Sequence, residues 1–314
     1  MDAIAVVLEE PRKLALQKLP LADAGEGCLL VDIEWSAIST GTERLLYEGR
    51  MPPFPGLGYP LVPGYEAVGR IIKTDASTGF RNGERVFVPG AAGCFGEVRS
   101  LFGAAASRVS VPAKRVVAID DATNKRGVLL ALAATAYHAI RLAGDGSAEC
   151  IVGHGVLGRL LARVIMALGG EPPVVWERNP IRASGATGYR VIDPDADPRH
   201  EYRLIYDVSG DASLLDSLIG RIAPGGEIVL AGFYSEPLSF AFPPAFMREA
   251  RIRVAAEWQP PDLIATKRLI ESGRLSLDGL ITHHHDAGAA PDAYRVAFED
   301  PSCLKMVLNW SSLS

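Results

Sequence analysis

The residues from 153 to 158 have the types and the spacing of a phosphate-binding turn. They read Gly153-His154-Gly155-Val156-Leu157-Gly158, a G-x-G-x-x-G motif that follows the apolar run Cys150-Ile151-Val152. The first glycine would permit the tight turn, the second would let the backbone approach a pyrophosphate, and the third would let helix and strand pack closely. The N–H groups that open the helix, at Val156 and Leu157, would bind phosphate oxygens. The motif predicts a dinucleotide site, with a purely structural glycine turn as the alternative.

An acidic residue follows at the distance that this motif requires. Glu177 lies 19 positions after Gly158, at the end of the next apolar run. Its carboxylate would accept hydrogen bonds from the ribose hydroxyls of the adenosine and would repel a 2′-phosphate, so NAD is favoured over NADP. Arg178 and Arg182 keep NADP open, because a guanidinium can pair with a phosphate. His154 is expected to fill a variable loop position.

The elements that must position these residues follow two patterns. The first ~120 residues hold short β-branched runs between Gly- and Pro-containing turns, which predicts a small, mostly antiparallel β domain. After residue 123 strands and helices alternate, which predicts a parallel, doubly wound sheet. The expected strands are 3–8, 29–35, 67–72, 85–88, 150–152, 174–176, 204–206, 228–230, 252–254 and 304–308. The expected helices are 126–142, 157–168, 212–222, 263–272 and 290–298.

Composition limits the class of protein. The chain has 314 residues and a net charge of −5, from 32 Lys and Arg against 37 Asp and Glu. That balance argues against a nucleic-acid or anionic-membrane partner held by bulk charge. Four cysteines without a CxxC pair argue against a disulfide scaffold or a CxxC zinc module. Without a basic N-terminal region or an 18-residue apolar run, we expect a cytoplasmic two-domain enzyme with no transmembrane segment.

Over almost its whole length the chain resembles the medium-chain dehydrogenase/reductase superfamily. The resemblance is carried by Gly83-Glu84-Arg85-Val86, by Thr135-Ala136-Tyr137-His138 and by 223–229. It implies a GroES-like β domain (1–122), a Rossmann NAD-binding domain (123–271) and a C-terminal return to the first domain (272–314). It also implies that Thr135 and Gly232 lie near the cofactor. A homodimer through the edge strand 252–254 is implied by the family alone.

The positions of the family's catalytic zinc ligands carry other residues here. Ser39 and Tyr65 stand where the family has the first Cys and the His, and the third ligand is missing near Ala131. Ser and Tyr are poor zinc ligands beside a thiolate and an imidazole. The four-Cys structural lobe is also absent, with only Cys94 in that region. We therefore expect no zinc.

A narrower resemblance points to one branch of this family, the dehydrogenases of bacteriochlorophyll biosynthesis. It is carried by long matches at 39–45, 51–66, 151–163 and 255–260. It implies oxidation of a 1-hydroxyethyl group on a bacteriochlorophyllide to an acetyl group, with NAD as the hydride acceptor. Composition and spacing by themselves do not indicate a tetrapyrrole.

Oxidation of a secondary alcohol without zinc needs another group to assist the hydroxyl. Tyr65 and Ser39 are the leading candidates for binding the substrate hydroxyl, with Thr40 and Glu66 as neighbours. Glu66 is expected to orient backbone or an arginine, and simple packing is the alternative for Tyr65. No Y-x-x-x-K motif follows Tyr65, so a short-chain-type tyrosinate is unsupported. A conjugated macrocycle can itself stabilise positive charge as hydride leaves.

Two further features allow more than one interpretation. Apolar residues of the Pro-rich loop would line a cleft for a flat substrate or pack on their own domain: Phe54, Leu57, Tyr59 and Leu61. The run 283–285 is three histidines, which cannot all face one point from a strand, so a solvated role is favoured over metal binding. A zinc-free quinone or enoyl reductase using NADPH, and a non-enzymatic pigment carrier or redox sensor, remain as alternative functions.

Overall fold

The computed structural model describes residues 1–22, 25–53, 55–91, 93–100, 102–144 and 148–313. They form two compact units: Met1–Ala131 with Leu280–Ser314 (unit 1), and Leu132–Gly279 (unit 2). These boundaries fall nine residues after the expected 122/123 and eight after the expected 271/272. No helix in the described part of the chain has the length and apolar character of a membrane span.

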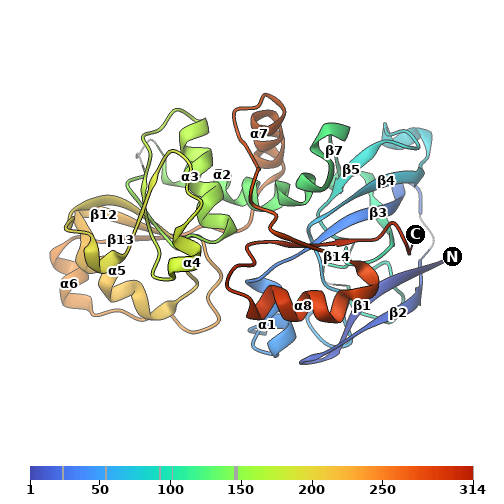
Figure 1. The fold of residues 1–314 in the computed structure, drawn as a ribbon, viewed down its shortest axis with the longest axis horizontal. Coiled ribbons are helices and arrows are strands. Elements are labelled where there is room, and N and C mark those ends of the chain that lie inside the picture. Colours follow the sequence, from blue (N-terminus) through green and yellow to red (C-terminus); the bar gives the residue numbers. More distant parts are fainter. Residues whose placement is uncertain (23–24, 54, 92, 101, 145–147, 314) are drawn as a thin grey trace. The chain divides into compact units, whose positions relative to one another are not determined.

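Unit 1 is built on a seven-stranded sheet with its longest strand near the centre (Figure 1). The strand order is β14-β15-β3-β4-β5-β7, and β6 pairs with the first residues of β3. All pairs are antiparallel except β14 with β15, and β1 and β2 form a separate hairpin. The strands are β1 (Asp2–Glu10), β2 (Lys13–Pro20), β3 (Cys28–Ile38), β4 (Ala67–Lys73), β5 (Arg85–Val88), β6 (Arg108–Pro112), β7 (Val117–Ala118), β14 (His283–Asp286) and β15 (Met306–Asn309).

The helices of unit 1 are short, and one of them closes the core. The α-helices are α1 (Thr42–Glu48) and α8 (Ala290–Glu299), and the 3-10 helices are η1 (Ala76–Thr78), η2 (Ala113–Arg115), η3 (Asp121–Leu129) and η6 (Ala287–Ala289). Figure 1 shows α8, in red, beside the β1–β2 hairpin. Its Ala293 and Tyr294 join Val31, Ile33 and Trp310 in one buried apolar cluster. The C-terminal segment from residue 280 to 313 therefore contributes several residues to the core of unit 1.

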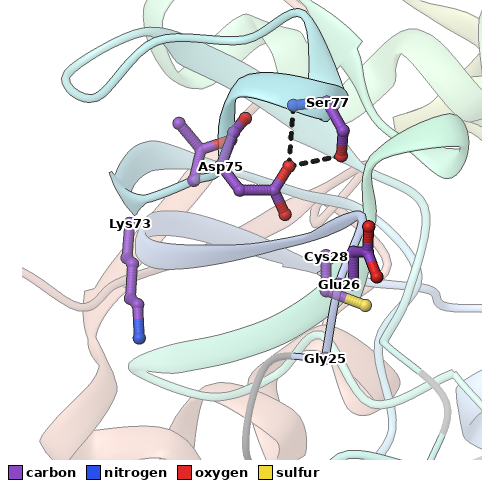
Figure 2. Close-up of a pocket in the computed structure, with 7 residues that line it drawn as sticks. Gly25, Glu26, Cys28, Lys73, Asp75 and Ser77 are labelled. Carbon is purple, nitrogen blue, oxygen red and sulfur yellow. Dashed lines mark hydrogen bonds between the residues drawn. The ribbon is translucent and has the colours of Figure 1, made fainter.

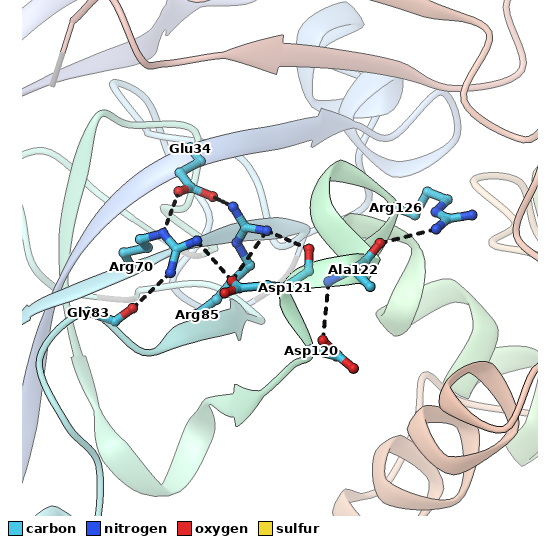
Figure 3. Close-up of polar contacts among 8 residues, drawn as sticks. All are labelled: Glu34, Arg70, Gly83, Arg85, Asp120, Asp121, Ala122 and Arg126. Atoms are coloured by element: carbon cyan, nitrogen blue, oxygen red, sulfur yellow. Dashed lines mark hydrogen bonds and ion pairs between the residues drawn. The ribbon is translucent and has the colours of Figure 1, made fainter.

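The segment before unit 2 is held to the sheet of unit 1 by charged side chains (Figure 3). Glu34 on β3 accepts hydrogen bonds from Arg70 on β4 and Arg85 on β5. The same two arginines bind Asp121, the first residue of η3, through its carboxylate and its carbonyl oxygen. These contacts keep η3 on strands β3, β4 and β5, which explains why unit 1 extends past residue 122.

The expected start of a helix at Arg126 is wrong. Residues 121–129 form the 3-10 helix η3, and the α-helix α2 (Leu130–Ala143) begins four residues later than expected. Asn124 has φ +47° and ψ −139°, a conformation that no α-helix continues through. Gly127 packs so closely on Ile119 and Val68 that a Cβ there would overlap both side chains. Periodicity alone did not reveal this kink.

Unit 2 contains a six-stranded parallel sheet in the order β10-β9-β8-β11-β12-β13. This is the doubly wound order, in which the direction of winding reverses between β8 and β11. Ligands bind outside the carboxyl ends of the strands at that reversal, which here are followed by Gly153 and Val208. The strands are β8 (Cys150–Val152), β9 (Val174–Trp176), β10 (Arg190–Ile192), β11 (Tyr202–Asp207), β12 (Ile222–Leu230) and β13 (Arg251–Val254).

The helices of unit 2 are α2, α3 (Val156–Ala167), α4 (Pro180–Ala183), α5 (Leu215–Arg221), α6 (Phe242–Met247) and α7 (Pro260–Glu271), with the 3-10 helices η4 (Pro194–Ala196) and η5 (Ala212–Leu214). Of these, α3 and α5 bury apolar residues and lie against strands β8 and β12. Gly169, with φ +89°, follows the C-cap of α3 and ends the helix. Arg274 donates to the carbonyl of Ala167, and Arg163 donates to those of Ser276 and Asp278. These bonds to α3 and its end keep residues 272–279 in unit 2.

Candidate functional site

The glycine turn of unit 2 has the geometry of a dinucleotide-binding loop. Gly153 has φ +102°, and a Cβ on Gly158 would overlap the carbonyl oxygen of Gly153, so neither position admits a side chain. By contrast, a Cβ on Gly155 would meet no heavy atom within 4 Å. Gly155 is also the N-cap of α3 and provides no side chain to cap it. The N–H groups at Val156 and Leu157 thus open a helix beside free space, which fits a pyrophosphate.

Glu177 lies against this turn. One carboxylate oxygen accepts the N–H of His154 at 3.1 Å, and the other accepts the N–H of Asn179 at 2.8 Å. A carboxylate has about four acceptor positions, so both oxygens can still accept ribose hydroxyls. Sequence reasoning placed Glu177 beside the turn, and the structure brings the two together. The residues present fit an adenosine diphosphate.

Arg178 and Arg182, the two arginines for which NADP stayed an alternative cofactor, have different surroundings. Arg178 is exposed, and its guanidinium binds both carboxylate oxygens of Asp195 at 3.0 and 2.9 Å. The carbonyl oxygen of Arg182 accepts hydrogen bonds from Arg159 and lies 2.6 Å from Nδ1 of His154. A 2′-phosphate would therefore have to compete with Asp195 for Arg178.

His154 is a buried structural residue as well as a loop residue. Its Nε2 lies 2.8 Å from the hydroxyl of Tyr189, and burial lowers the pKa of its imidazole to about 4. Arg159, also buried, donates to the carbonyls of His154, Arg182, Ser184 and Gly185. The two side chains tie the glycine turn to residues 182–189. The sequence did not predict these contacts of His154 and Arg159. The signal that could have indicated them is the arginine directly after the third glycine of the motif.

Gly232 and Thr135 lie on other elements of unit 2. A Cβ on Gly232 would meet the backbone of Gly210 and Val208 at 3.0 to 3.3 Å, and Gly153 approaches the same turn, near Ser209 and Val208. Gly232 is therefore joined to the glycine turn through residues 208–210. Thr135 lies half-buried on α2. Its place near the cofactor stays a prediction.

The candidate catalytic residues of unit 1 form a second polar cluster. The hydroxyl of Tyr65 donates to Oγ of Ser39 at 2.7 Å and lies 3.5 Å from Oγ1 of Thr42. Ser39 follows β3 and Tyr65 precedes β4, so the pairing of β3 with β4 brings the two turns together. Thr40 is half-buried beside Ser39. We call Ser39, Thr42, Glu43, Tyr65, Glu66, Tyr294 and Lys305 the hydroxyl cluster.

Two buried carboxyl groups flank the Ser39–Tyr65 pair. Oε2 of Glu66 accepts a hydrogen bond from Nζ of Lys305 at 2.7 Å, and neither side chain is more than 2% exposed. Its Oε1 has no partner among the described residues. Glu43 accepts hydrogen bonds from the N–H of Ser39 and from the hydroxyl of Tyr294. The expectation that Glu66 orients backbone or an arginine is wrong, because its partner is a lysine.

Burial controls the protonation of this cluster. Desolvation raises the pKa of the Tyr65 hydroxyl well above its usual 10, and the nearby Glu66 raises it further. Tyr65 is therefore neutral near pH 7 and acts as a hydrogen-bond donor. Burial also raises the pKa of Glu43 to about 7. A neutral donor suits the stabilisation of an oxygen that gains negative charge.

The Pro-rich loop packs on its own unit. Leu61 is buried with Leu8 and Leu46, and Leu57 and Tyr59 pack against that cluster. The hydroxyl of Tyr59 donates to the carbonyl of Leu46. Phe54, the fourth expected cleft residue, lies outside the described residues. Of the two interpretations of this loop, packing on its own domain accounts for Leu57, Tyr59 and Leu61.

The histidine run and a surface pocket are two further features of unit 1, and the N–H of His283 donates to the carbonyl oxygen of Lys305 at 3.2 Å. His283 and His285 are half-buried on β14 and His284 is exposed, so the three alternate in direction. Among the described residues no three His, Cys, Asp or Glu side chains are grouped to hold a metal ion. A pocket of about 340 Å³ lies near the start of β3 (Figure 2). Asp75 in it is bound to Ser77 and to the N–H of Gly27, and no member of the hydroxyl cluster lines it.

Comparison with known proteins agrees with this architecture. Residues 25–121 match the alcohol dehydrogenase GroES-like domain. An Escherichia coli alcohol dehydrogenase solved with NADH has a TM-score of 0.84 at 21% identity, covering 98% of this chain and 99% of that one. A Sinorhizobium meliloti protein described as a candidate zinc-binding dehydrogenase, solved with NADP, has a TM-score of 0.81 at 20% identity, with coverage of 98% and 99%. The predicted GroES-like and Rossmann architecture is confirmed.

Two curated relatives are much more similar. Proteins named 2-desacetyl-2-hydroxyethyl bacteriochlorophyllide A dehydrogenase share 56% identity in Rhodobacter capsulatus and 58% in Cereibacter sphaeroides. Both alignments cover 99% of this chain and 99% of the relative. The chain therefore belongs to the bacteriochlorophyllide hydroxyethyl dehydrogenases of the medium-chain dehydrogenase/reductase superfamily.

Proposed function

We propose that this protein oxidises the 1-hydroxyethyl group of a bacteriochlorophyllide to an acetyl group, with NAD as the hydride acceptor and without a catalytic metal. The observation that carries the proposal is the identity of 56–58%, over 99% of each chain, to dehydrogenases named for this substrate. The reaction converts a secondary alcohol to a ketone and releases one proton. It needs a nucleotide site and a group that binds the hydroxyl, and unit 2 and unit 1 contain candidates for each.

The glycine turn and Glu177 would hold the cofactor, whose nicotinamide supplies the hydride acceptor when bound. The N–H groups at Val156 and Leu157 bind the pyrophosphate, and Glu177 binds the ribose hydroxyls. NAD is favoured over NADP for two reasons. A 2′-phosphate beside Glu177 would meet a like charge, and Arg178 is already paired with Asp195.

The Ser39–Tyr65 pair would bind the substrate hydroxyl. Tyr65 donates its proton to Oγ of Ser39, so the hydroxyl proton of Ser39 is free to point toward the substrate oxygen. The substrate hydroxyl loses its proton to water, and the hydride then passes from the adjacent carbon to the nicotinamide acceptor. The neutral Ser39 hydroxyl donates to the alkoxide oxygen, while Tyr65 holds Oγ of Ser39 in place. Thr40 and Glu66 complete the candidate set as neighbours of this pair. The conjugated macrocycle reduces the need for a strong base, since it stabilises positive charge at the reacting carbon.

The donor chemistry of the cluster supports a reaction without zinc. Ser39 and Tyr65 provide neutral hydroxyl oxygens, the pKa of Tyr65 is raised, and Ala131 provides no donor. A structural or catalytic zinc is bound by thiolate, imidazole or carboxylate. The cluster has two carboxyl groups, Glu43 and Glu66, but in the described part of the chain no three His, Cys, Asp or Glu side chains are grouped. The hydroxyls therefore take the place of a Lewis acid by hydrogen bonding.

We also propose a homodimer, located in the cytoplasm, that forms through β13. This strand is the edge of the parallel sheet, and all four of its residues are exposed. An uncovered edge presents unpaired backbone groups that pair with another strand. Val254 and the exposed apolar residues Phe242, Phe246 and Met247 of α6 would be covered by a second copy. Light scattering should give twice the chain mass, and Val254→Lys should give monomers; a monomeric wild type would refute the dimer.

One assay tests the catalytic proposal. The purified chain is mixed with 3-hydroxyethyl bacteriochlorophyllide a and with NAD or NADP, and NADH and the acetyl pigment are quantified together. We expect one NADH per acetyl product, a lower kcat/KM with NADP, and no stoichiometric zinc by elemental mass spectrometry. Preference for NADPH with a quinone or enone would favour the reductase, and pigment binding without NADH formation would favour a carrier or sensor.

Tyr65→Phe tests the hydroxyl-binding role. Loss of the donor that holds Oγ of Ser39 should misdirect the Ser39 hydroxyl and lower kcat by about tenfold or more. The variant keeps the ring that packs on Phe102. Unchanged turnover would remove Tyr65 from the mechanism and leave it a packing role.

A further inference from the structure

The last 35 residues of the chain send two side chains into the hydroxyl cluster. Lys305 precedes β15 and binds Glu66, the residue after Tyr65. Tyr294 lies on α8 and donates its hydroxyl to Oε2 of Glu43 at 2.8 Å. Each carboxyl group beside the Ser39–Tyr65 pair thus has a partner from this segment. The Glu43–Tyr294 contact takes no part in the reaction proposed above.

Glu43 holds the backbone of Ser39 from both sides. The N–H of Ser39 donates to Oε1 of Glu43 at 3.3 Å, and the N–H of Glu43 donates to the carbonyl oxygen of Ser39 at 3.1 Å. Glu43 has no exposed surface, and Tyr294 is 1% exposed. With Oε1 bound to Ser39 and Oε2 bound to Tyr294, the carboxyl group cannot rotate without breaking a hydrogen bond. The orientation of the Ser39 peptide therefore depends on Tyr294.

We propose that Glu43 and Tyr294 are positioning residues that aim the hydroxyl of Ser39 at the substrate oxygen. The proposal rests on the function proposed above, in which Ser39 binds the alcohol. Tyr294 fixes Glu43, Glu43 fixes the Ser39 peptide, and the peptide sets the direction of the side chain. A misplacement of a reacting group by about 1 Å can lower a rate by about a hundredfold.

The charges around Glu43 make this arrangement dependent on pH. The groups that face it are Tyr294, Glu66 and Lys305, and Tyr65 lies close enough to be influenced by it. The two carboxyl groups of Glu43 and Glu66 are thus near one cation, Lys305, which is hydrogen-bonded to Glu66. Burial is the main reason that the pKa of Glu43 rises to about 7, and the Tyr294 hydroxyl opposes that rise. As pH increases through about 7, Glu43 ionises and accepts both hydrogen bonds more strongly.

The alternative is that this contact only attaches α1 to α8. A merely structural tie would affect stability and leave the rate of hydride transfer and its pH profile unchanged. Tyr294→Phe removes the hydroxyl and keeps the ring that packs on Phe298. Tyr47→Phe is the matched control, because Tyr47 packs on the same Phe298 ring from α1.

The test measures kcat, KM and pH profile for the wild type and four variants with NAD and the hydroxyethyl pigment. We expect Tyr294→Phe to lower kcat by about tenfold with little change in KM or in NADH binding by fluorescence. Its kcat inflection should move to higher pH, because a donor to the carboxylate is lost. In Glu43→Gln the amide oxygen can still accept the N–H of Ser39, and Nε2 can donate to the Tyr294 oxygen, which reverses that hydrogen bond. This variant should retain more of kcat than Glu43→Ala and lose the inflection, whereas Glu43→Ala should fall below Tyr294→Phe. Tyr47→Phe should behave as wild type.

Two results separate the possible failures. Wild-type kcat and pH profile in Tyr294→Phe would overturn the positioning role while the wild type still oxidised the pigment. A wild type that formed no NADH from the pigment, yet bound NADH, would refute the proposed function itself.

Discussion

Lys305 gives the sharpest prediction about stability, because its ion pair with Glu66 is completely enclosed. The two atoms are 2.7 Å apart, and the side chains are 2% and 0% exposed. Lys305→Met keeps the length and apolar stem of the side chain and removes its charge. Glu66 would then be a buried carboxylate without a cation, with one oxygen that already has no partner in the described structure.

The expected cost follows from that burial. Removing one partner of a buried pair destabilises a protein by about 3–5 kcal/mol, because the remaining charge stays desolvated. Removing both charges avoids this penalty. The double variant with Glu66→Gln and Lys305→Met should therefore recover most of the unfolding free energy that Lys305→Met alone loses.

Urea unfolding followed by tryptophan fluorescence measures the free energy of unfolding for each variant. The Lys267–Glu271 pair is the control, since it has nearly the same separation, 2.8 Å, but lies on the surface of α7 with the side chains 27% and 31% exposed. Lys267→Met should change stability by about 0.5 kcal/mol or less. A loss below about 1 kcal/mol in Lys305→Met, or no recovery in the double variant, would refute the burial argument.

Three further predictions concern unit 2. Gly158→Ala should reduce NADH binding, measured by fluorescence, by about tenfold or more, because the new Cβ would overlap the carbonyl of Gly153; unchanged binding would contradict the close packing. Glu177→Ala should raise KM for NAD by about tenfold and bring kcat/KM with NADP closer to that with NAD, as measured in steady-state assays with both cofactors. His154, with a pKa lowered from 6.5 to about 4, takes up a proton more readily when unfolded. Stability should thus fall by about 1.4 kcal/mol per pH unit from pH 6.5 toward 4 in urea unfolding, and His154→Asn should lack this slope.

The strands that could be predicted are those with apolar side chains on a buried face. All three residues of β8, Cys150–Val152, are buried, so the strand consists of apolar residues and could be predicted from that run. β10 and β14 could not be found in this way. β10 has only Val191 and Ile192 as apolar residues, and β14 is His-His-His-Asp. Both are sheet edges, where backbone pairing with one neighbour replaces side-chain burial.

The glycine turn and the hydroxyl cluster differ in how well they could be predicted from the sequence. The glycine turn and Glu177 are close in the sequence, and their spacing follows from one strand-helix-strand unit. The partners in the hydroxyl cluster are not close. Lys305 is 239 residues from Glu66, and Tyr294 is 251 residues from Glu43. The available signal was a lone lysine between Leu304 and Met306 in a predicted buried strand, since such a charge must find a partner.

The discontinuity of unit 1 has a consequence for synthesis of the protein. Residues 132–279 are complete, and free to fold, while β14, α8 and β15 are still unmade. The indole of Trp310 reaches back 274 residues to Ser36, so the sheet of unit 1 closes only after this late segment leaves the ribosome. Until then Glu66 has no cation and Glu43 has no tyrosine. The candidate nucleotide-binding turn can therefore fold earlier in translation than the hydroxyl cluster, which lacks two of its side chains until residues 294 and 305 have been made.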